Sequence, residues 1–464
     1  MRRLTIILAL LCAAAVAAPA AQASSKQLLV MQDDALLYRN GPVVRDQTLD
    51  EFEQLGADVV KVQVYWREVA PAGRRKPAGF DGANPASYDW SLYDGLVSGI
   101  VARGMRPFLT LGNTAPDWAT AKVTRRKGIY RPSAKEFGLF ARAAGTHYPD
   151  VDIWSVWNEP NLFSWLSPQT SKGAPTSPSI YRELYLAGHK GLSATGHGGD
   201  TILIGELMPR AGIDTKRKVP PVDFLREMAC LDKNYRQYRG TAAKRRGCKD
   251  VGRIPTSGIA YHPYTLFRGG PNTPAQQGDA EISTLSRITK VADKLASKGK
   301  LPRGLKLWIT EFGFQTNPPD RLQDRLQKVS GYMDESEWMT FRNRRVASYA
   351  QYTLRDEPLT SSWQAGLRFH DGRAKKYVYD AFRQPVYVRA LSGSRVEIFG
   401  ASRLKPRTTA TIASRSGKGK FQPLGSATLN SAGYFRKTFS VRSPSDRTYR
   451  ITIDGRSRDK SAVR

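Results

Sequence analysis

The sequence predicts an α/β fold, a (β/α)8 (TIM) barrel followed by a small all-β domain that resembles a sandwich. Before residue 385, short apolar runs rich in Val, Ile and Leu recur eight times, each followed by a helix-like segment. The runs are continuous rather than alternating, which is typical of parallel strands buried on both faces. After Gln384 the pattern changes to short alternating runs separated by Gly, Ser, Asn and Pro, which predicts the second domain.

The predicted strands and helices of the barrel alternate along the chain. We expect the strands at 27–31, 58–65, 106–111, 151–157, 201–207, 256–261, 305–311 and 361–367. We expect the helices at 47–56, 91–103, 133–146, 179–195, 221–230, 280–298, 322–356 and 374–383. An open, doubly wound sheet is the alternative, but no Gly-rich phosphate-binding loop follows the first predicted strand.

The second domain is predicted from five short alternating runs, at 395–399, 408–412, 427–429, 434–441 and 449–453. It contains no His, Cys or Trp and no evident acidic pair, so we assign it no catalysis. Polymer binding and a structural or spacer role both stay open for it.

The N-terminus has the pattern of a secretory signal peptide. Arg2 and Arg3 precede an apolar run at 4–16, and Ala21-Gln22-Ala23 has the small residues that signal peptidase accepts. We expect 1–23 to be removed, 24–384 to form the barrel and 385–464 the small β-domain. A retained anchor is the alternative, but the run is short for a spanning helix and no later window approaches 18 uncharged apolar residues. The sequence thus predicts a secreted protein without a stable membrane anchor.

Export would place the cysteines of the mature chain in an oxidising compartment. Cys12 lies in the predicted leader, which leaves Cys230 and Cys248. An even pair in an oxidising compartment predicts one disulfide, with two free thiols as the alternative. Three Cys and five His are too few to favour a multi-ligand zinc or iron–sulfur site.

The chain is strongly basic, with 72 Lys and Arg against 41 Asp and Glu and a net charge of +31. Such a charge can attract acidic polymers, and an acidic glycan stays open as a partner. The alternative is a charge spread over the solvated surface. We find no signature of a nucleic-acid-binding fold and expect no nucleic-acid partner. Basic clusters occur at 74–76, 122–127, 216–218 and 244–246.

Two glutamates stand at the ends of predicted barrel strands. Glu159 follows the run at 151–157, and Glu311 ends the run at 305–311. Barrel active sites lie at the carboxyl ends of the strands, and strands four and seven face each other. Two carboxyl groups about 5 Å apart suit retaining glycoside hydrolysis, whereas the inverting reaction needs a wider gap for water. For either glutamate alone, a structural ion pair is the alternative.

The residues around both glutamates resemble a known group of enzymes. The segment Trp157-Asn158-Glu159-Pro160-Asn161 resembles the acid/base motif of glycoside hydrolase clan A, the retaining (β/α)8 glycosidases. The segment from Trp308 to Gly313 resembles the nucleophile strand of the same clan, and the order and the separation of 152 residues between 159 and 311 agree with it. The resemblance covers residues 28–384 and is closest to families 5 and 39.

The resemblance implies roles for three residues. Glu159 would be the general acid and then the base, Glu311 the nucleophile, and Asn158 a partner of the sugar 2-hydroxyl. A turn-forming role is the alternative for Asn158. The resemblance implies neither a metal nor an organic cofactor.

Other residues are weaker candidates for binding the sugar. His262 and Tyr264 resemble the His-x-Tyr of the clan, in which Tyr264 would hydrogen-bond Glu311. Trp363, on the predicted strand 361–367, resembles the aromatic platform under the sugar. A packed aromatic pair and a core tryptophan are the respective alternatives.

Three further residues follow strands two and three, namely Trp118, Trp66 and Arg67. Trp118 would form a second aromatic wall, and Trp66 or Arg67 would reach the rim. Lys61 and Asn113 stand where family 5 commonly has Arg and His, which weakens the assignment to that family but leaves the two glutamates unaffected.

The sequence therefore predicts a secreted retaining glycoside hydrolase acting on β-linked sugars of a poly- or oligosaccharide. A non-catalytic glycan-binding surface protein on a barrel scaffold and a transglycosylase are the alternatives. The identity of the sugar, its linkage and the exo or endo mode depend on loop shapes that sequence patterns do not give.

Overall fold

The computed structural model describes residues 26–211, 216–265, 269–358, 363–404 and 408–463. The predicted signal peptide lies outside these residues. In the part of the chain that is described, no helix has the length and apolar character needed to cross a membrane.

Eight parallel strands close into a barrel, which confirms the predicted fold class. Their order around the barrel is β1, β10, β9, β8, β7, β4, β3, β2, so neighbours in sequence are neighbours in space. Strand β2, with the sequence VVKVQVY, is buried at six of its seven positions because side chains point into the barrel on one face and against helices on the other. The strands are β1 (Leu28–Gln32), β2 (Val59–Tyr65), β3 (Arg106–Gly112), β4 (Ile153–Val156), β7 (Thr201–Leu207), β8 (Gly258–Tyr261), β9 (Lys306–Ile309) and β10 (Val346–Tyr352).

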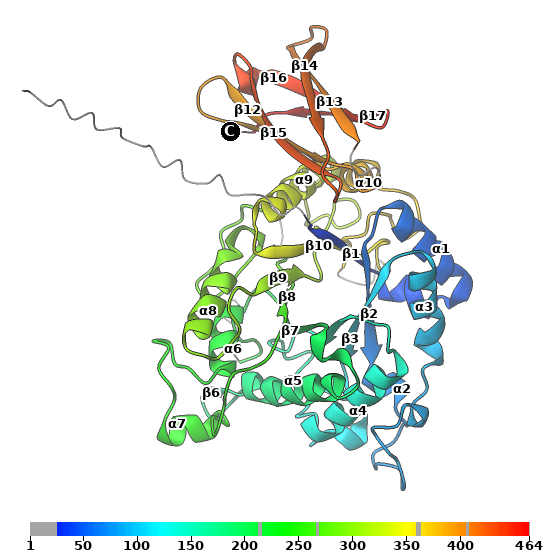
Figure 1. The fold of residues 1–464 in the computed structure, drawn as a ribbon, viewed down its shortest axis with the longest axis vertical. Coiled ribbons are helices and arrows are strands. Elements are labelled where there is room, and N and C mark those ends of the chain that lie inside the picture. Colours follow the sequence, from blue (N-terminus) through cyan, green and yellow to red (C-terminus); the bar gives the residue numbers. More distant parts are fainter. Residues whose placement is uncertain (1–25, 212–215, 266–268, 359–362, 405–407, 464) are drawn as a thin grey trace, which may run out of the picture.

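Helices surround the barrel strands (Figure 1). Helix α4 illustrates why they form, because the Ser133 hydroxyl caps its first turn by accepting from the Glu136 amide. Its apolar residues Phe137, Phe140 and Ala144 then recur at helical spacing and are buried. The helices are α1 (Gly41–Gln54), α2 (Trp66–Val69), α3 (Ser91–Ala102), α4 (Ala134–His147), α5 (Ser177–Ser193), α6 (Pro221–Met228), α7 (Gly240–Arg245), α8 (Ser286–Ser297), α9 (Leu326–Arg342) and α10 (Lys376–Arg383). A two-residue pair, β5 (Thr170–Ser171) and β6 (Ala174–Pro175), lies in the loop after β4.

The prediction of the eighth strand at 361–367 is wrong. The strand is β10, inside the segment 322–356 that was predicted as one helix, and residues 363–367 form no strand. The connection from α9 to β10 is only three residues long and contains neither Gly nor Pro. Asn343 makes the turn, because its side-chain oxygen accepts from the Arg345 amide and its carbonyl from the Val346 amide. The usual signals for a break between helix and strand are therefore missing.

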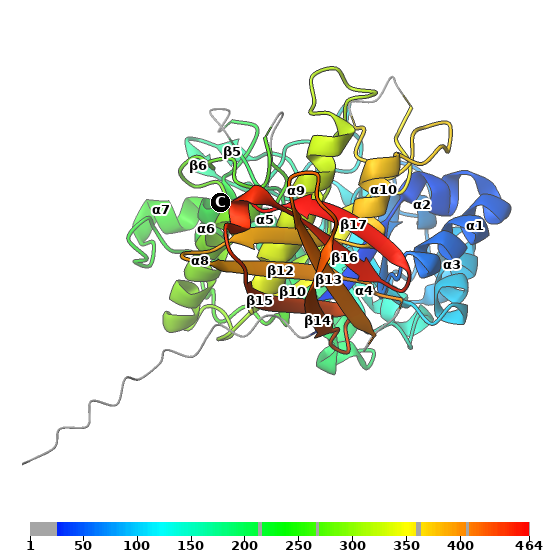
Figure 2. The same ribbon diagram turned by 90° about the horizontal axis from the view of Figure 1, so that it is seen from above.

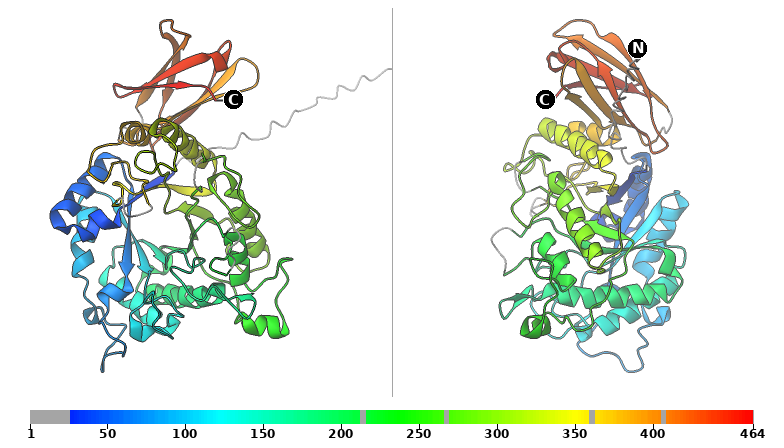
Figure 3. Two further views of the ribbon diagram at one scale, coloured as in Figure 1. Left: turned by 180° about the vertical axis from the view of Figure 1, so that it is seen from behind. Right: turned by 60° about the vertical axis from the view of Figure 1, so that its left-hand side comes forward.

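Two antiparallel sheets follow the barrel (Figures 1 and 3). One has the order β11, β12, β15 and the other β14, β13, β16, β17. Figure 2 shows both sheets lying over α9 and α10. The strands are β11 (Val386–Ala390), β12 (Arg395–Ala401), β13 (Thr409–Ser416), β14 (Gln422–Thr428), β15 (Tyr434–Ser440), β16 (Arg447–Ile453) and β17 (Arg456–Ser461), of which β11 and β17 were not predicted.

The sheets pack onto α9 through an aromatic cluster. Trp338 and Phe341 of α9 contact Tyr387, Phe399 and Tyr434 from the first sheet, and all five are buried. Ion pairs to two buried carboxylates join the same surfaces, from Arg458 to Asp334 and from Arg403 to Glu337. Apolar burial and paired charges together fix the sheets to the base of α9.

The predicted disulfide is confirmed. Cys230 and Cys248 are bonded and buried, with their Cα atoms 5.6 Å apart. The bond closes the loop that carries α7. Arg182 of α5 donates to the Met228, Arg246 and Gly247 carbonyls, which attaches this loop to the barrel.

Candidate active site

Glu159 and Glu311 come together at the carboxyl end of the barrel. Glu159 lies three residues beyond β4, and Glu311 lies two residues beyond β9. Both carboxylates approach the same atom, His262 Nδ1, at 3.1 Å for Glu159 Oε1 and 3.4 Å for Glu311 Oε2. The two oxygens are thus at most 6.5 Å apart, the sum of these distances. Their side chains keep 15% and 9% of their exposure, so both can meet a substrate at the barrel mouth.

A buried cation holds the Glu311 carboxylate in place. Lys61 Nζ, from β2, lies 2.9 Å from Glu311 Oε1 and 2.5 Å from Glu206 Oε2. The Gln63 amide, also from β2, donates to the same Glu311 oxygen at 3.2 Å. The Tyr264 hydroxyl donates to the other oxygen, Oε2, at 3.3 Å. Groups from β2 and from the loop after β8 thus fix the orientation of Glu311.

Glu206, from the end of β7, is the third carboxylate of this network. It is fully buried, and His262 Nε2 lies 3.2 Å from its Oε2. The Thr110 hydroxyl donates to Oε1 at 2.8 Å, and the Ser155 hydroxyl donates to the same atom. Because Glu206 is fully buried and lies against both Lys61 and His262, it is a counter-ion for these two residues rather than a group exposed to substrate.

The charges of this network shift the pKa values of its members. Burial by itself would raise the pKa of Glu206, but the charge of Lys61 and the hydrogen bond from His262 lower it to about 2. Burial by itself would lower the pKa of His262, but Glu311, Glu159 and Glu206 raise it from 6.5 to about 9. Burial likewise opposes the charge of Lys61, and the carboxylates Glu206 and Glu311 raise its pKa above the usual 10.5. Near neutral pH, His262 is therefore a cation held between carboxylates.

This ionisation predicts a pH dependence of stability. A raised histidine pKa contributes stability that is fully present below pH 6.5 and is lost as the pH rises through about 9. We expect the free energy of unfolding to fall over this range, by at most about 3 kcal/mol. Urea unfolding at successive pH values measures it. The His262→Asn variant should lose this part of the pH dependence, whereas His147→Asn, outside the site, should keep it. Parallel curves for wild type and His262→Asn would contradict the assignment.

The backbone around the site is strained. Asn113 after β3, Trp157 and Glu159 after β4, and Glu206 in β7 all have positive φ, between 37° and 65°. Residues other than glycine rarely adopt this conformation, and such residues concentrate at active sites. Here the turns aim the side chains that follow the strands into the barrel mouth.

Two buried amides near the glutamates have polar atoms without a protein partner. Both side-chain atoms of Asn113 and the Oδ1 atom of Asn158 make no hydrogen bond among the described residues. The two residues are at most 3% exposed. A buried amide without a partner is unfavourable, and hydroxyl groups of a bound sugar can supply the missing hydrogen bonds.

Comparison with known proteins agrees with this geometry. Residues 45–214, 170 of the 464, match a family model described as glycosyl hydrolase family 1. The resemblance to clan A is confirmed. The matching family is family 1 rather than family 5 or 39. No protein with a curated description matches the chain.

Solved structures with some similarity to the chain include three glycosidases. A β-glucosidase from Trichoderma harzianum is 13% identical, with a TM-score of 0.44 over 79% of this chain and 98% of that one. A glycoside hydrolase family 5 protein from Bacteroides vulgatus is 11% identical, with a TM-score of 0.44 over 92% and 89% of the two chains. An endo-1,4-β-xylanase from Penicillium canescens is 10% identical, with a TM-score of 0.44 over 77% and 94%. The fold assignment itself rests on the strand order of the barrel.

The apolar run 361–367 predicted that Trp363 lies on a strand, and this is wrong. Trp363 lies in the loop after β10, yet its ring packs against Tyr264 with centroids 4.8 Å apart. Trp363, Tyr264 and Glu159 all line one cavity at the barrel mouth. The tryptophan thus reaches the site from a loop.

The structure does not bring Trp66, Trp118 and Arg67 to the glutamates. Trp66 is fully buried and stacks on Phe140 of α4, so its candidate role in sugar binding is corrected to a core residue. The Trp118 indole donates to the Pro71 carbonyl and packs edge-on against Trp66. Arg67 forms an ion pair of 2.6 Å with Asp117. These residues join the loops after β2 and β3 to α4.

Glu206 was missed as a site residue, and Lys61 was noted only as a departure from family 5. A signal for both is present in the sequence. Each is the one charged residue of a mostly apolar run, in VVKVQVY and TILIGEL. A charge on a strand buried on both faces needs a partner of opposite sign from another strand.

The network also has the spacing of a metal site. Ligand atoms of Glu206, His262 and Glu311 lie within 4.8 Å of one another. Lys61 already lies against both carboxylates, at 2.5 and 2.9 Å, so it supplies the positive charge that a metal ion would bring. The residues present fit an ammonium group better than a divalent ion.

Proposed function

We propose that the protein is a secreted retaining glycoside hydrolase that cleaves β-linked O-glycosidic bonds of a poly- or oligosaccharide by double displacement. The observation that carries the proposal is the convergence of Glu159 and Glu311 on one nitrogen of His262, which keeps them within 6.5 Å. Retaining enzymes have their carboxyl groups about 5–5.5 Å apart, and inverting enzymes about 6.5–9.5 Å. Secretion is supported by the signal-like residues 1–23 and by the disulfide.

In the first step, a carboxylate oxygen of Glu311 attacks the anomeric carbon. Glu159 gives its proton to the glycosidic oxygen, the bond between that oxygen and the anomeric carbon breaks, and the leaving sugar departs with a hydroxyl group. The product is an ester between Glu311 and the anomeric carbon. Lys61, Gln63 and Tyr264 orient the nucleophile for this attack.

In the second step, Glu159 accepts a proton from water, and the hydroxide attacks the anomeric carbon and releases Glu311. Glu159 gave up its proton in the first step, so in the intermediate it is a carboxylate and can act as the base. Two displacements at the same carbon retain the β configuration.

The intermediate provides the test of this function. We expect 2-deoxy-2-fluoro glycosides with a dinitrophenyl leaving group, tried in the gluco, galacto, manno and xylo series, to label Glu311. Mass spectrometry of the digested protein should find one added sugar on the peptide containing Glu311, and the Glu311→Gln variant should stay unlabelled. Hydrolysis of a glycan without such labelling, or labelling of another residue, would contradict the proposal. A protein that binds glycans but is neither labelled nor active would favour the binding scaffold.

A further inference from the structure

A cavity of about 370 Å³ opens beside Glu159 at the barrel mouth. Aromatic side chains form part of its wall, among them Tyr264, Phe314, Tyr332 and Trp363. Such rings suit the CH faces of a sugar. Glu159 lines the cavity, whereas Glu311 is not among its lining residues. A sugar ring in the cavity therefore lies beside the proton donor.

The charged groups of this cavity differ in how they are neutralised. Arg210 forms an ion pair of 2.9 Å with the buried Glu281. Asp324 accepts from Lys328 at 3.0 Å and from the Tyr332 hydroxyl at 2.8 Å. Lys218 is half-buried in the wall, and among the described residues it has neither an ion pair nor a side-chain hydrogen bond. It is the cation that a ligand in the cavity can still pair with.

The backbone fixes Lys218 close to Glu159. Lys218 forms an antiparallel β-bridge with Leu162, and the Leu162 amide donates to the Glu159 carbonyl at 2.9 Å. The next residue, Phe163, donates its amide to the Arg217 carbonyl at 2.9 Å. The loop after Glu159 and the loop after β7 are thus paired through their backbones.

Two arginines extend the positive charge outward from Lys218. The guanidinium carbon of Arg217 lies 3.8 Å from the centroid of the Phe163 ring, and that of Arg126 lies 5.1 Å from it. Both arginines are exposed. We call Arg126, Arg217 and Lys218 the basic rim. It brings together the sequence clusters 122–127 and 216–218, which are far apart along the chain, at the loop that follows Glu159.

We propose that the basic rim binds an anionic substituent, a carboxylate or a sulfate, on the sugar of the glycan that lies beside Glu159. This inference rests on the proposed function and names its substrate class. A neutral sugar would cover the Lys218 ammonium and leave it without a counter-charge, whereas an anionic group gives it a charge-assisted hydrogen bond. Arg126 and Arg217 then attract the next anionic residues of the chain.

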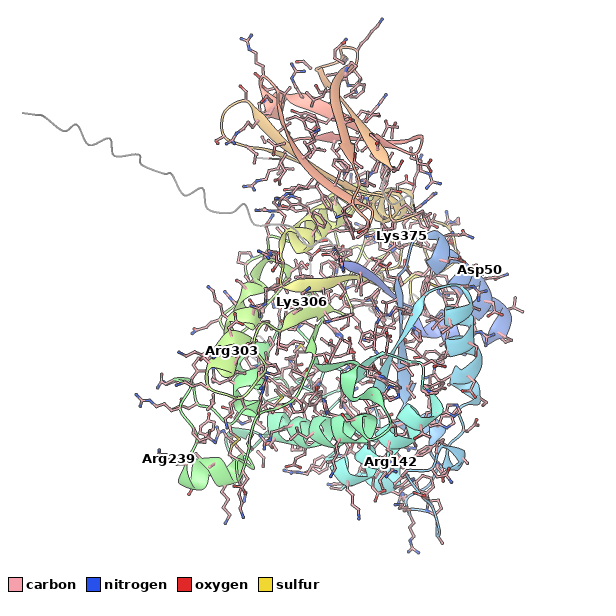
Figure 4. All side chains as sticks on the ribbon, in the orientation of Figure 1. Asp50, Arg142, Arg239, Arg303, Lys306 and Lys375 are labelled. Atoms are coloured by element: carbon pink, nitrogen blue, oxygen red, sulfur yellow. A yellow bond between two sulfur atoms is a disulfide. The ribbon has the colours of Figure 1, made fainter. Side chains whose placement is uncertain are left out.

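The basic rim differs from the other basic residues of the surface in its position, because Lys218 lines the same cavity as Glu159. Many of the basic residues are spread over the surface, such as Arg142, Arg239 and Arg303, which lie apart from one another (Figure 4). Those residues explain a general attraction to polyanions. They do not explain a cation in the wall of the cavity that contains the acid.

Matched pairs of polymers test the proposal with the full-length mature protein. Glucuronoxylan, hyaluronan and alginate are each assayed before and after carboxyl reduction, and carrageenan before and after desulfation. For at least one pair, we expect kcat/KM to be about tenfold higher for the anionic form at low salt. The Lys218→Glu variant should lower this ratio by about tenfold or more. Lys418→Glu, in the turn between β13 and β14, makes the same change in net charge and should leave the ratio as in wild type. The pair that responds distinguishes a carboxylate from a sulfate.

Binding to the Glu159→Gln variant separates this inference from the proposed function. Calorimetry should show binding of the responsive anionic polymer that weakens with added salt and with Lys218→Glu. Hydrolysis that does not favour the anionic form of any pair would overturn the inference and leave the proposed function standing. Binding that depends on Lys218 in a protein without any hydrolysis would support the inference and overturn the proposed function. Equal effects of Lys218→Glu and Lys418→Glu would show that the preference depends on the net charge of the protein and not on the basic rim.

Discussion

Replacing Glu311 by alanine should lower kcat by about 10⁴-fold or more, because the covalent intermediate can no longer form. Replacing Glu159 by alanine should lower kcat by about 10²–10⁴-fold, the usual contribution of a general acid and base. The losses should be measured on the best glycan found in the labelling and polymer assays. Circular dichroism and urea unfolding establish that each variant is folded. Glu183→Ala, on the exposed face of α5, is the control and should retain wild-type activity.

Rescue by azide distinguishes the nucleophile from the acid/base, however large the fall in kcat of each variant is. With an aryl β-glycoside, azide should restore turnover of Glu311→Ala by attacking the anomeric carbon directly, which gives the α-glycosyl azide. In Glu159→Ala, Glu311 still forms the ester, and azide then displaces it to give the β-glycosyl azide. Products of the same configuration from both variants would contradict the assignment. Activity near that of wild type in either variant would exclude that residue from the chemistry.

The sequence patterns predict the barrel well because its signals are local. Seven of the eight barrel strands lie within a few residues of their expected positions, since each is a continuous apolar run. The eighth strand was missed because Asn343 alone makes the turn between α9 and β10. A single residue with this role is hard to recognise inside an amphipathic segment.

The candidate site was only partly predictable from sequence. The residues around Glu159 and Glu311 follow their strands directly, so a short motif identifies them. Lys61 and Glu206 are 145 positions apart, and their pairing depends on how β2 and β7 face each other inside the barrel. Trp66 is an example of a wrong prediction. Its position directly after a strand predicted that it reaches the rim of the barrel, but packing against α4 buries it. Local patterns give the position of a residue along the chain but not the side chains it meets.

Replacing the buried Lys61 should have the second large effect, a loss of stability. We expect Lys61→Met to lower the free energy of unfolding by about 3–5 kcal/mol, as is usual when one member of a buried ion pair is removed. Met has a similar size but carries no charge, so the buried carboxylate of Glu206 loses the ammonium group at 2.5 Å. Urea unfolding near pH 7 measures the change. Activity should fall as well, because Glu311 Oε1 loses a donor at 2.9 Å.

A double variant separates the two roles of Lys61. Lys61→Met with Glu206→Gln removes one charge of each sign, and replacing a buried ion pair by neutral groups of similar size is often tolerated. We therefore expect the double variant to recover much of the lost stability, which a double-mutant cycle reports as a favourable coupling energy. Its activity should stay low, since Glu311 still lacks Lys61. A double variant no more stable than Lys61→Met would show that Lys61 is not the counter-ion that stabilises Glu206.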